Sequence, residues 1–147
     1  MLYSATPQFV PFGRATLTRD LFAYYYSERE SLKKVLLEAP GHICLTTDNW
    51  KASHSKQHYI CVTAHFVDKN WKLNKRILRF RGLSPPYDGE NVAEEIWMFL
   101  NQWNLEHKVM SLTVDNASYN DLMISHLKYR LMGRGMLVGS GRFFHIR

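Results

Sequence analysis

The chain has 147 residues, of which 46% are hydrophobic and 22% are charged, a balance typical of a globular protein. A chain of this length buries roughly 70% of the surface that it exposes when unfolded, which is enough for one domain with a real core. The composition excludes a wholly disordered protein, and no apolar run approaches the roughly 20 residues that a membrane-spanning helix needs. We therefore expect a soluble intracellular protein that does not contact a membrane.

The net charge of +6 lies entirely in the middle of the chain. Residues 43–82 hold eight basic and two acidic side chains, and the segments on either side are close to neutral. Such a stretch suits a polyanion, because basic side chains neutralise phosphates and aromatic rings stack on bases. The alternative is a solvated hairpin face, and charge alone leaves both open. The aromatic members of the stretch are Trp50, Tyr59, Trp71 and Phe80, and the basic residues expected to bind nucleic acid are Lys51, Lys56, Lys72, Lys75, Arg76, Arg79 and Arg81.

The first third of the chain predicts an extended segment followed by a helix. Residues 1–17 are rich in Pro, Gly, Ser and Thr and are predicted to be an extended lead-in to a domain that covers 18–147. A helix is expected to begin at Thr18 or Asp20, because apolar residues then recur about every 3.6 positions, and to end before Pro40. The aromatic residues at 24–26 of this helix are expected in the core.

The rest of the chain predicts a mixed sheet with helices. Strand-like runs at 43–47, 59–67 and 71–83 form an expected antiparallel meander. An amphipathic helix at 92–103, a strand at 109–114, a helix that ends near Gly133 and the start of a fifth strand at 142–147 follow. A strand–helix–strand crossover requires a parallel pair, so the fourth strand is expected beside the first. The order β-β-β-α-β-α-β, after an N-terminal helix, matches an α/β fold of the RNase H-like kind.

Two aspartates stand where parallel strands would end. Asp48 follows the first predicted strand and Asp115 follows the fourth, 67 positions later. Parallel neighbours place their carboxyl ends at one edge of a sheet, and two carboxylates close together favour a bound cation such as Mg²⁺ or Mn²⁺. The alternative is structural: Asp48 as a turn residue, and Asp115, Asn116 or Ser118 as the cap of the next helix.

Histidine and cysteine do not indicate a zinc site. The seven histidines have no metal-binding spacing, and His65 is interpreted as a packed strand residue. Cys44 and Cys61 lie in strand-like runs without CxxC spacing and are expected to be buried free thiols. Nucleotide-binding glycine motifs and the serine-hydrolase elbow are absent from the sequence.

Four runs of sequence carry a family resemblance that covers about residues 11–147. They are Leu45-Thr46-Thr47-Asp48-Asn49-Trp50, Tyr59-Ile60-Cys61-Val62-Thr63-Ala64-His65-Phe66, Lys75-Arg76-Ile77-Leu78 and Thr113-Val114-Asp115-Asn116-Ala117-Ser118-Tyr119-Asn120. In this order they resemble the hAT superfamily of transposases, and most of all the plant zinc-finger BED proteins of the RICESLEEPER and DAYSLEEPER type. One departure is Lys51-Ala52-Ser53 after Trp50, where the family pattern often reads Thr-Ser.

The resemblance implies a nuclear, DNA-binding RNase H-like core in which Asp48 and Asp115 are the first two catalytic, metal-binding acids. It also implies a BED zinc finger before this region and a helical insertion, a third acid (a glutamate) and a dimerisation region after it. We therefore expect an incomplete core, inactive in strand transfer by itself. The alternatives are a non-catalytic, domesticated regulator that contacts DNA or protein, and a chain that folds only in part.

Overall fold

The computed structural model describes residues 12–146, so most of the predicted lead-in lies outside the described residues. The chain divides into two compact units, one up to Lys34 and one from Val35 onward. Residue 18, where the domain is expected to begin, lies inside a helix. Within the described residues, no helix combines the length and the apolarity that crossing a bilayer requires.

The first unit consists of most of helix α2 (Arg14–Glu38), which begins four residues before Thr18. The expectation that its aromatic residues belong to the core is wrong: Tyr24, Tyr25 and Tyr26 are 66%, 54% and 55% exposed. Up to Lys34, α2 is the one described element, so the unit offers these rings no second element to pack against. Tyr26 contacts only close neighbours in the helix, with ring centroids 5.5 Å from Tyr25 and 6.5 Å from Phe22.

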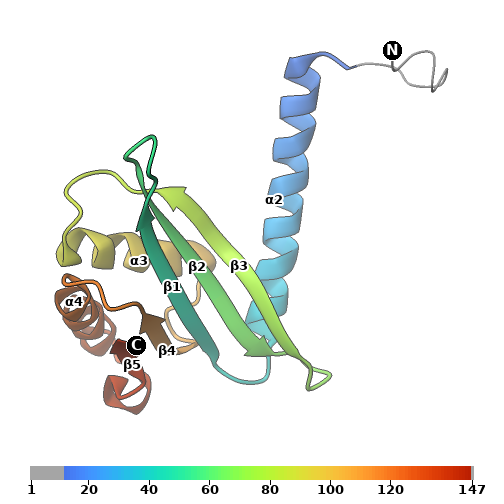
Figure 1. The fold of residues 1–147 in the computed structure, drawn as a ribbon. Helices are drawn as coiled ribbons and strands as arrows, with labels where there is room; N and C mark the ends of the chain where they lie inside the picture. The colour runs from blue at the N-terminus through green and yellow to red at the C-terminus, as the bar shows by residue number, and fades with distance from the viewer. Residues whose placement is uncertain (1–11, 147) are drawn as a thin grey trace. The chain divides into compact units, whose positions relative to one another are not determined.

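The second unit is built on a five-stranded sheet with the order β3-β2-β1-β4-β5. The strands are β1 (Ile43–Lys51), β2 (His58–Val67), β3 (Leu73–Gly82), β4 (Val109–Val114) and β5 (Phe144–Ile146). The first three form an antiparallel meander, and β4 pairs parallel with β1, as the crossover argument predicts. Figure 1 shows this mixed sheet, which confirms the α/β, RNase H-like order of elements.

Two helices follow the meander and cover one face of the sheet. Helix α3 (Gly89–Trp103) is capped by Asp88, whose carboxylate accepts a hydrogen bond from the Asn91 amide at 2.9 Å. Its apolar residues recur at helical spacing, and Ile96, Phe99 and Leu100 are completely buried. Helix α4 (Asn120–Gly133) packs against α3, and a short 3-10 helix (Val138–Gly141) leads to β5.

Gly89 lets the two helices approach closely. A side-chain carbon at this position would lie 2.5 Å from the Tyr119 carbonyl oxygen and 2.8 Å from the Met123 amide nitrogen. Both atoms belong to the backbone at the start of α4, so they have little freedom to move. The start of α4, and the residues around it, are therefore held in place by direct contact with the first turn of α3.

The last turn of α2 belongs to the second unit and is held by Lys108. The Lys108 ammonium donates to the carbonyl oxygens of Leu36, Leu37 and Ala39 at 3.1, 2.8 and 2.6 Å. These carbonyls have no partner within a helix that ends at Glu38, so the cation closes the helix end. Partial burial lowers the pKa of the Lys108 ammonium.

The turn between β2 and β3 explains why β3 begins later than expected. Asp68 accepts hydrogen bonds from the amides of Asn70 and Lys72 at 2.9 and 3.1 Å, and these bonds lower the pKa of its carboxyl group. Trp71 has a φ of 60°, a left-handed conformation that no strand residue adopts. Trp71 is therefore part of the turn, and the strand starts at Leu73.

Candidate functional site

Asp48 lies inside β1 rather than at its end, which corrects the strand boundary expected at residue 47. The antiparallel ladder with β2 continues to the pair Lys51 and His58 and keeps β1 extended past the aspartate. The parallel ladder with β4 is shorter, and its last pair is Thr46 with Thr113. Two residues beyond that pair, on the same face of the sheet, stand Asp48 and Asp115.

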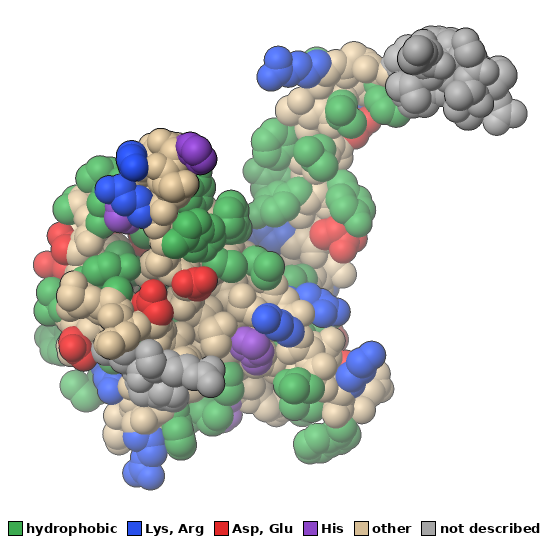
Figure 2. Space-filling model, viewed as in Figure 1, with side chains coloured by type: hydrophobic (Ala, Val, Ile, Leu, Met, Phe, Trp, Pro, Cys, Tyr) green, Lys and Arg blue, Asp and Glu red, His purple; other side chains and the backbone are tan. Residues whose placement is uncertain are grey.

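The side chain of Tyr119 lies close to both carboxylates. Burial raises the pKa of its hydroxyl, the Asn49 side chain opposes this shift, and the charges of Asp115 and Asp48 raise the pKa further. The charges of the two aspartates, 67 positions apart in sequence, therefore both act on one phenol. Both are exposed to solvent. Figure 2 shows acidic side chains close together over this part of the sheet.

Asp115 has a fixed orientation because Asn120 holds it. The Asn120 side-chain amide donates to Oδ1 of Asp115 at 2.7 Å and to the backbone carbonyl oxygen of the same residue at 2.7 Å. Asn120 is fully buried at the start of α4. One carboxylate oxygen of Asp115 is thus engaged by the protein, and no described residue forms a hydrogen bond with the other.

The structural alternatives for the aspartates are not realised. The N-cap of α4 is Tyr119, and no side chain caps the helix, so Asp115, Asn116 and Ser118 do not have the expected capping role. Asp48 is in a paired strand and is not a turn residue. Neither carboxylate has the local function that acids at strand ends commonly serve.

The donor set fits a hard divalent cation. Two carboxylates from neighbouring strands supply the oxygen ligands that Mg²⁺ and Mn²⁺ prefer, and Mg²⁺ commonly binds one or two carboxylates while it keeps several waters. Within residues 12–146, no group of three or more His, Cys, Asp or Glu side chains could hold a metal ion. In the described part of the chain, Asp48 and Asp115 would thus offer a cation two carboxylates without a third acidic neighbour.

An aromatic cluster lies on the same face as Asp48. The rings of Trp50, Tyr59 and Phe80 have centroids 5.6–5.8 Å apart, from three adjacent strands. Trp50 and Phe80 are 38% and 63% exposed. A shallow groove lined by Asp48, Trp50, Phe80 and Lys75, among others, connects the cluster to the aspartate. Hydrophobic side chains gather beside the acidic ones on this face (Figure 2).

The structure does not bring the seven predicted DNA-binding residues onto one surface. Arg79 and Arg81 form ion pairs with Glu95 of α3, at 2.8 and 3.4 Å, on the face that the helices cover. Lys75 lies in the groove beside Asp48. The others are divided between the two ends of the meander and its third strand: Lys51 and Lys56 at the β1–β2 hairpin, Lys72 in the β2–β3 turn and Arg76 in β3.

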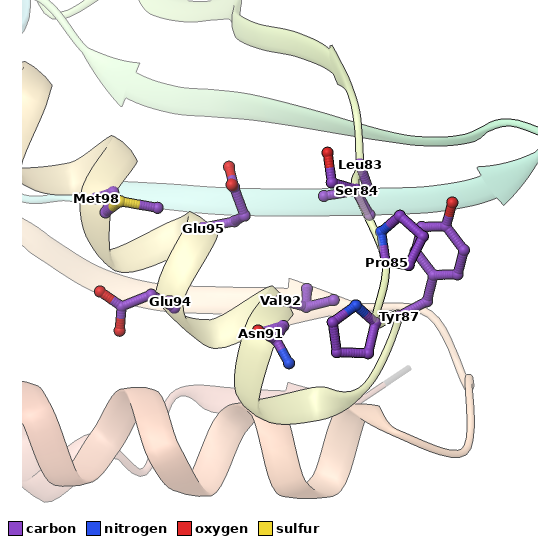
Figure 3. A pocket seen from close by; sticks show the side chains of 10 residues that line it. Leu83, Ser84, Pro85, Tyr87, Asn91, Val92, Glu94, Glu95 and Met98 are labelled. Atoms are coloured by element: carbon purple, nitrogen blue, oxygen red, sulfur yellow. The ribbon is translucent and has the colours of Figure 1, made fainter.

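A second pocket lies between the residues after β3 and α3. Its walls include Pro85, Tyr87, Asn91, Glu94 and Met98 (Figure 3). The Tyr87 ring stacks on the His58 ring with centroids 3.9 Å apart. The carboxylate of Glu94 forms an ion pair with Arg130, and the aspartate pair does not line this pocket.

The two cysteines and His65 have the surroundings of structural residues. Cys44 and Cys61 are free thiols, as expected, but they are half-buried rather than buried, because both lie on the face of the sheet without α3 and α4. Nε2 of His65 lies 3.2 Å from the Thr46 hydroxyl, as a packed strand residue would. Burial, and then the nearby charge of Lys75, lower the pKa of the His65 imidazole.

Comparison with known proteins identifies the architecture. The family described as the ZBED1 RNase-like domain matches residues 46–143. This range is about two thirds of the chain and includes both aspartates. The chain belongs to this family. It is 31% identical over 145 residues to the Putative AC transposase of Zea mays, covering 98% of this chain and 18% of that protein. It is 30% identical over 145 residues, 98% of this chain and 20% of the relative, to Zinc finger BED domain-containing protein RICESLEEPER 2 of Oryza sativa subsp. japonica.

A third relative, Zinc finger BED domain-containing protein DAYSLEEPER of Arabidopsis thaliana, is 30% identical over 117 residues, 80% of this chain and 17% of the relative. The chain thus spans about a fifth of the length of the curated relatives that it matches. These matches confirm the resemblance to hAT transposases and to the RICESLEEPER and DAYSLEEPER proteins.

Sequence reasoning missed Asn120 and the position of Tyr119 beside the two aspartates. Both residues are within the run that carries the resemblance, but nothing in their spacing distinguishes a ligand-orienting amide from a helix-capping one. The usable signal is chemical. An asparagine at the first position of α4 is completely buried, and a buried amide needs partners that only the aspartate before it supplies.

Proposed function

We propose that this chain is the metal- and DNA-contacting part of a transposase-derived protein that works in the nucleus. The carrying observation is that Asp48 and Asp115 stand two residues beyond the last pair of a parallel ladder and share Tyr119 as a neighbour. Two such carboxylates hold Mg²⁺ or Mn²⁺, which supplies charge stabilisation for phosphoryl transfer. The names of the relatives, a transposase and zinc-finger BED proteins, support the same reading.

The exposed face of the sheet supports a nucleic-acid strand as the ligand. Trp50 and Phe80 offer exposed ring surfaces, and stacking on such surfaces does not depend on base identity. The segment from Lys51 to His58, which follows Trp50, contains two lysines and no acid. The bases of a nucleic-acid strand can stack on the aromatic cluster while its phosphates pair with these lysines. A strand bound in this way passes the aspartates.

We expect this chain alone to bind DNA without cutting it. A phosphoryl-transfer site of this kind uses two metals about 3.5–4 Å apart, and two carboxylates hold the second metal poorly. A non-catalytic, DNA-binding regulator is therefore the alternative for the protein that contains this domain, and the aromatic cluster and basic hairpin serve both. Robust Mg²⁺-dependent cleavage of DNA by the purified chain would refute the expected inactivity.

DNA binding is tested by fluorescence anisotropy with a labelled oligonucleotide over a series of salt concentrations. Each lysine–phosphate contact contributes about 0.7–0.9 to the slope of log K against log salt. Replacing both Lys51 and Lys56 by alanine is expected to reduce that slope by about 1.5 and to weaken binding. The matched control replaces Lys34 and Lys128, which lie outside the basic segment, and should leave the slope unchanged. Equal slopes for both pairs of substitutions would remove the hairpin from the proposal.

The metal contribution is tested in the same assay with and without Mg²⁺. We expect Mg²⁺ to increase affinity at constant ionic strength, because a cation between the aspartates attracts phosphate, and Asp48→Asn should abolish the increase. Asp20→Asn makes the same change of charge at an exposed residue of α2 that forms an ion pair with Arg19, and it should retain the increase. A Mg²⁺ effect that survives Asp48→Asn would contradict the metal role.

A further inference from the structure

The surroundings of Asp115 identify a residue to which the family comparison gives no role. Asn120 has no exposed surface, although its side chain is polar. Its amide nitrogen makes two hydrogen bonds of 2.7 Å, one to the Oδ1 atom and one to the carbonyl oxygen of Asp115. A fully buried amide is costly unless it is paired, so this side chain is committed to Asp115.

The amide fixes the aspartate at two atoms. A hydrogen bond to the backbone carbonyl oxygen sets the position of the main chain after β4, and the bond to Oδ1 sets the rotation of the carboxylate. Oδ1 is thereby directed toward the protein and Oδ2 is left for a ligand. Residues that orient a metal-binding side chain in this way commonly affect metal affinity by 10–100-fold.

The oxygen atom of the Asn120 amide supports the same function. Oδ1 of Asn120 is buried and makes no hydrogen bond with any described residue, and the buried hydroxyl oxygen of Thr47 is in the same condition. A residue chosen for stability alone would satisfy its oxygen or be apolar, because an unpaired buried acceptor costs about 1–3 kcal/mol. In Asn120, the unpaired oxygen carries this cost, whereas the amide nitrogen makes the two hydrogen bonds to Asp115.

We propose that Asn120 is a positioning residue, which holds Asp115 so that its free oxygen and the carboxylate of Asp48 bind one divalent cation. This inference rests on the proposed metal site and assigns the geometry of that site to α4. Gly89 also helps to hold Asn120 in place. It lets α3 approach closely, and this contact fixes the backbone of Tyr119 and Met123, which lie on either side of Asn120 in the chain.

The test is a titration of the full chain with Mg²⁺, followed by NMR. In the natural protein, the side-chain amide signals of Asn120 are expected to move with the backbone signals of Asp48 and Asp115 and to saturate at the same Mg²⁺ concentration. This common response would show that the cation binds at the carboxylate that Asn120 contacts, and substitution of Asn120 tests the positioning role. The side-chain signals of Asn116, which follows Asp115 directly but is exposed, serve as the internal control and should move little.

The matched substitutions are Asn120→Leu and Asn116→Leu. Leucine has the same branched shape as asparagine but is larger, and it removes both the donor and the unpaired oxygen. We expect the melting temperature of Asn120→Leu to fall, because the carbonyl oxygen of Asp115 loses its partner. Its Mg²⁺ affinity should fall by about tenfold or more, whereas Asn116→Leu should keep the natural affinity.

The outcomes separate the two proposals. If the natural chain binds Mg²⁺ at the aspartates and Asn120→Leu binds it equally well, the positioning role is refuted and the metal site stands. If the natural chain shows no Mg²⁺ response at Asp48 and Asp115, the proposed metal function fails and the positioning role fails with it. If Asn120→Leu does not fold, Asn120→Ala, which removes the amide without adding bulk, takes its place, and a natural Mg²⁺ affinity in Asn120→Ala refutes the positioning role.

Discussion

His65 shows how one residue carries a stability cost that depends on pH. Burial and the charge of Lys75 lower the pKa of its imidazole below the ordinary value of 6.5, so the unfolded chain binds a proton more readily than the folded one. The cost is absent above pH 6.5 and fully present below the lowered, folded-state pKa. The bond between its ring and Thr46 keeps it within the sheet.

We therefore expect the chain to lose stability as the pH falls from about 7 to 5, and His65→Gln to lose less. Glutamine keeps a hydrogen-bonding side chain but cannot take up a proton. The measurement is the melting temperature of both proteins across this range by circular dichroism. His107→Gln, at an exposed turn position before β4, is the control. Parallel pH curves for the natural protein and His65→Gln would contradict the assignment.

At the scale of elements, the sequence predicts what depends on local pattern. The alternation of apolar residues in 59–67 and the helical spacing in 92–103 give elements close to those observed, and the crossover rule places β4 beside β1. Non-local contacts that change strand boundaries and side-chain partners could not be predicted. β1 continues past Asp48 because β2 pairs with it, and Arg79 and Arg81 form ion pairs with Glu95 because α3 lies beside β3.

Gly89→Ala is expected to lower stability by about 1–3 kcal/mol. The added methyl group would meet the backbone of α4 at 2.5 and 2.8 Å, and neither atom can rotate away, so the two helices must separate. Chemical denaturation measures the change. Gly133→Ala is the control, since a methyl group there meets nothing within 4 Å. Equal stabilities for the two variants would show that α3 and α4 do not depend on this contact.

At the scale of the whole molecule, the chain combines one well-packed unit with a unit that consists, among the described residues, of a single helix up to Lys34. The second unit contains the continuous core formed by β1, β2, α3 and α4, including Leu45, Val62, Ile96 and Leu127 at 1% exposure or less. In the first unit, α2 exposes the aromatic residues 24–26. The sequence could not distinguish these cases, because an apolar stripe on a helix has the same spacing whether or not a partner covers it.

The two units are expected to differ in hydrogen exchange. The amides of α2 before Lys34 have backbone bonds that water reaches easily, whereas those of α3 open only when the core opens. Hydrogen–deuterium exchange of the full chain, read by mass spectrometry, should show α2 peptides from residues 14–34 exchanging at least about tenfold faster than α3 peptides. Equal protection of the two helices would mean that a partner covers α2.

The central claim is that one cation binds between two strands, and Mn²⁺ tests it most directly, because this paramagnetic ion broadens NMR signals near it. At the lowest Mn²⁺ concentrations, we predict simultaneous broadening of the backbone amide signals of Asp48, Asp115 and Tyr119, and loss of that broadening in both Asp48→Asn and Asp115→Asn. Broadening that begins instead at the histidines of the 52–58 hairpin, or that persists when either aspartate is replaced, would contradict the account.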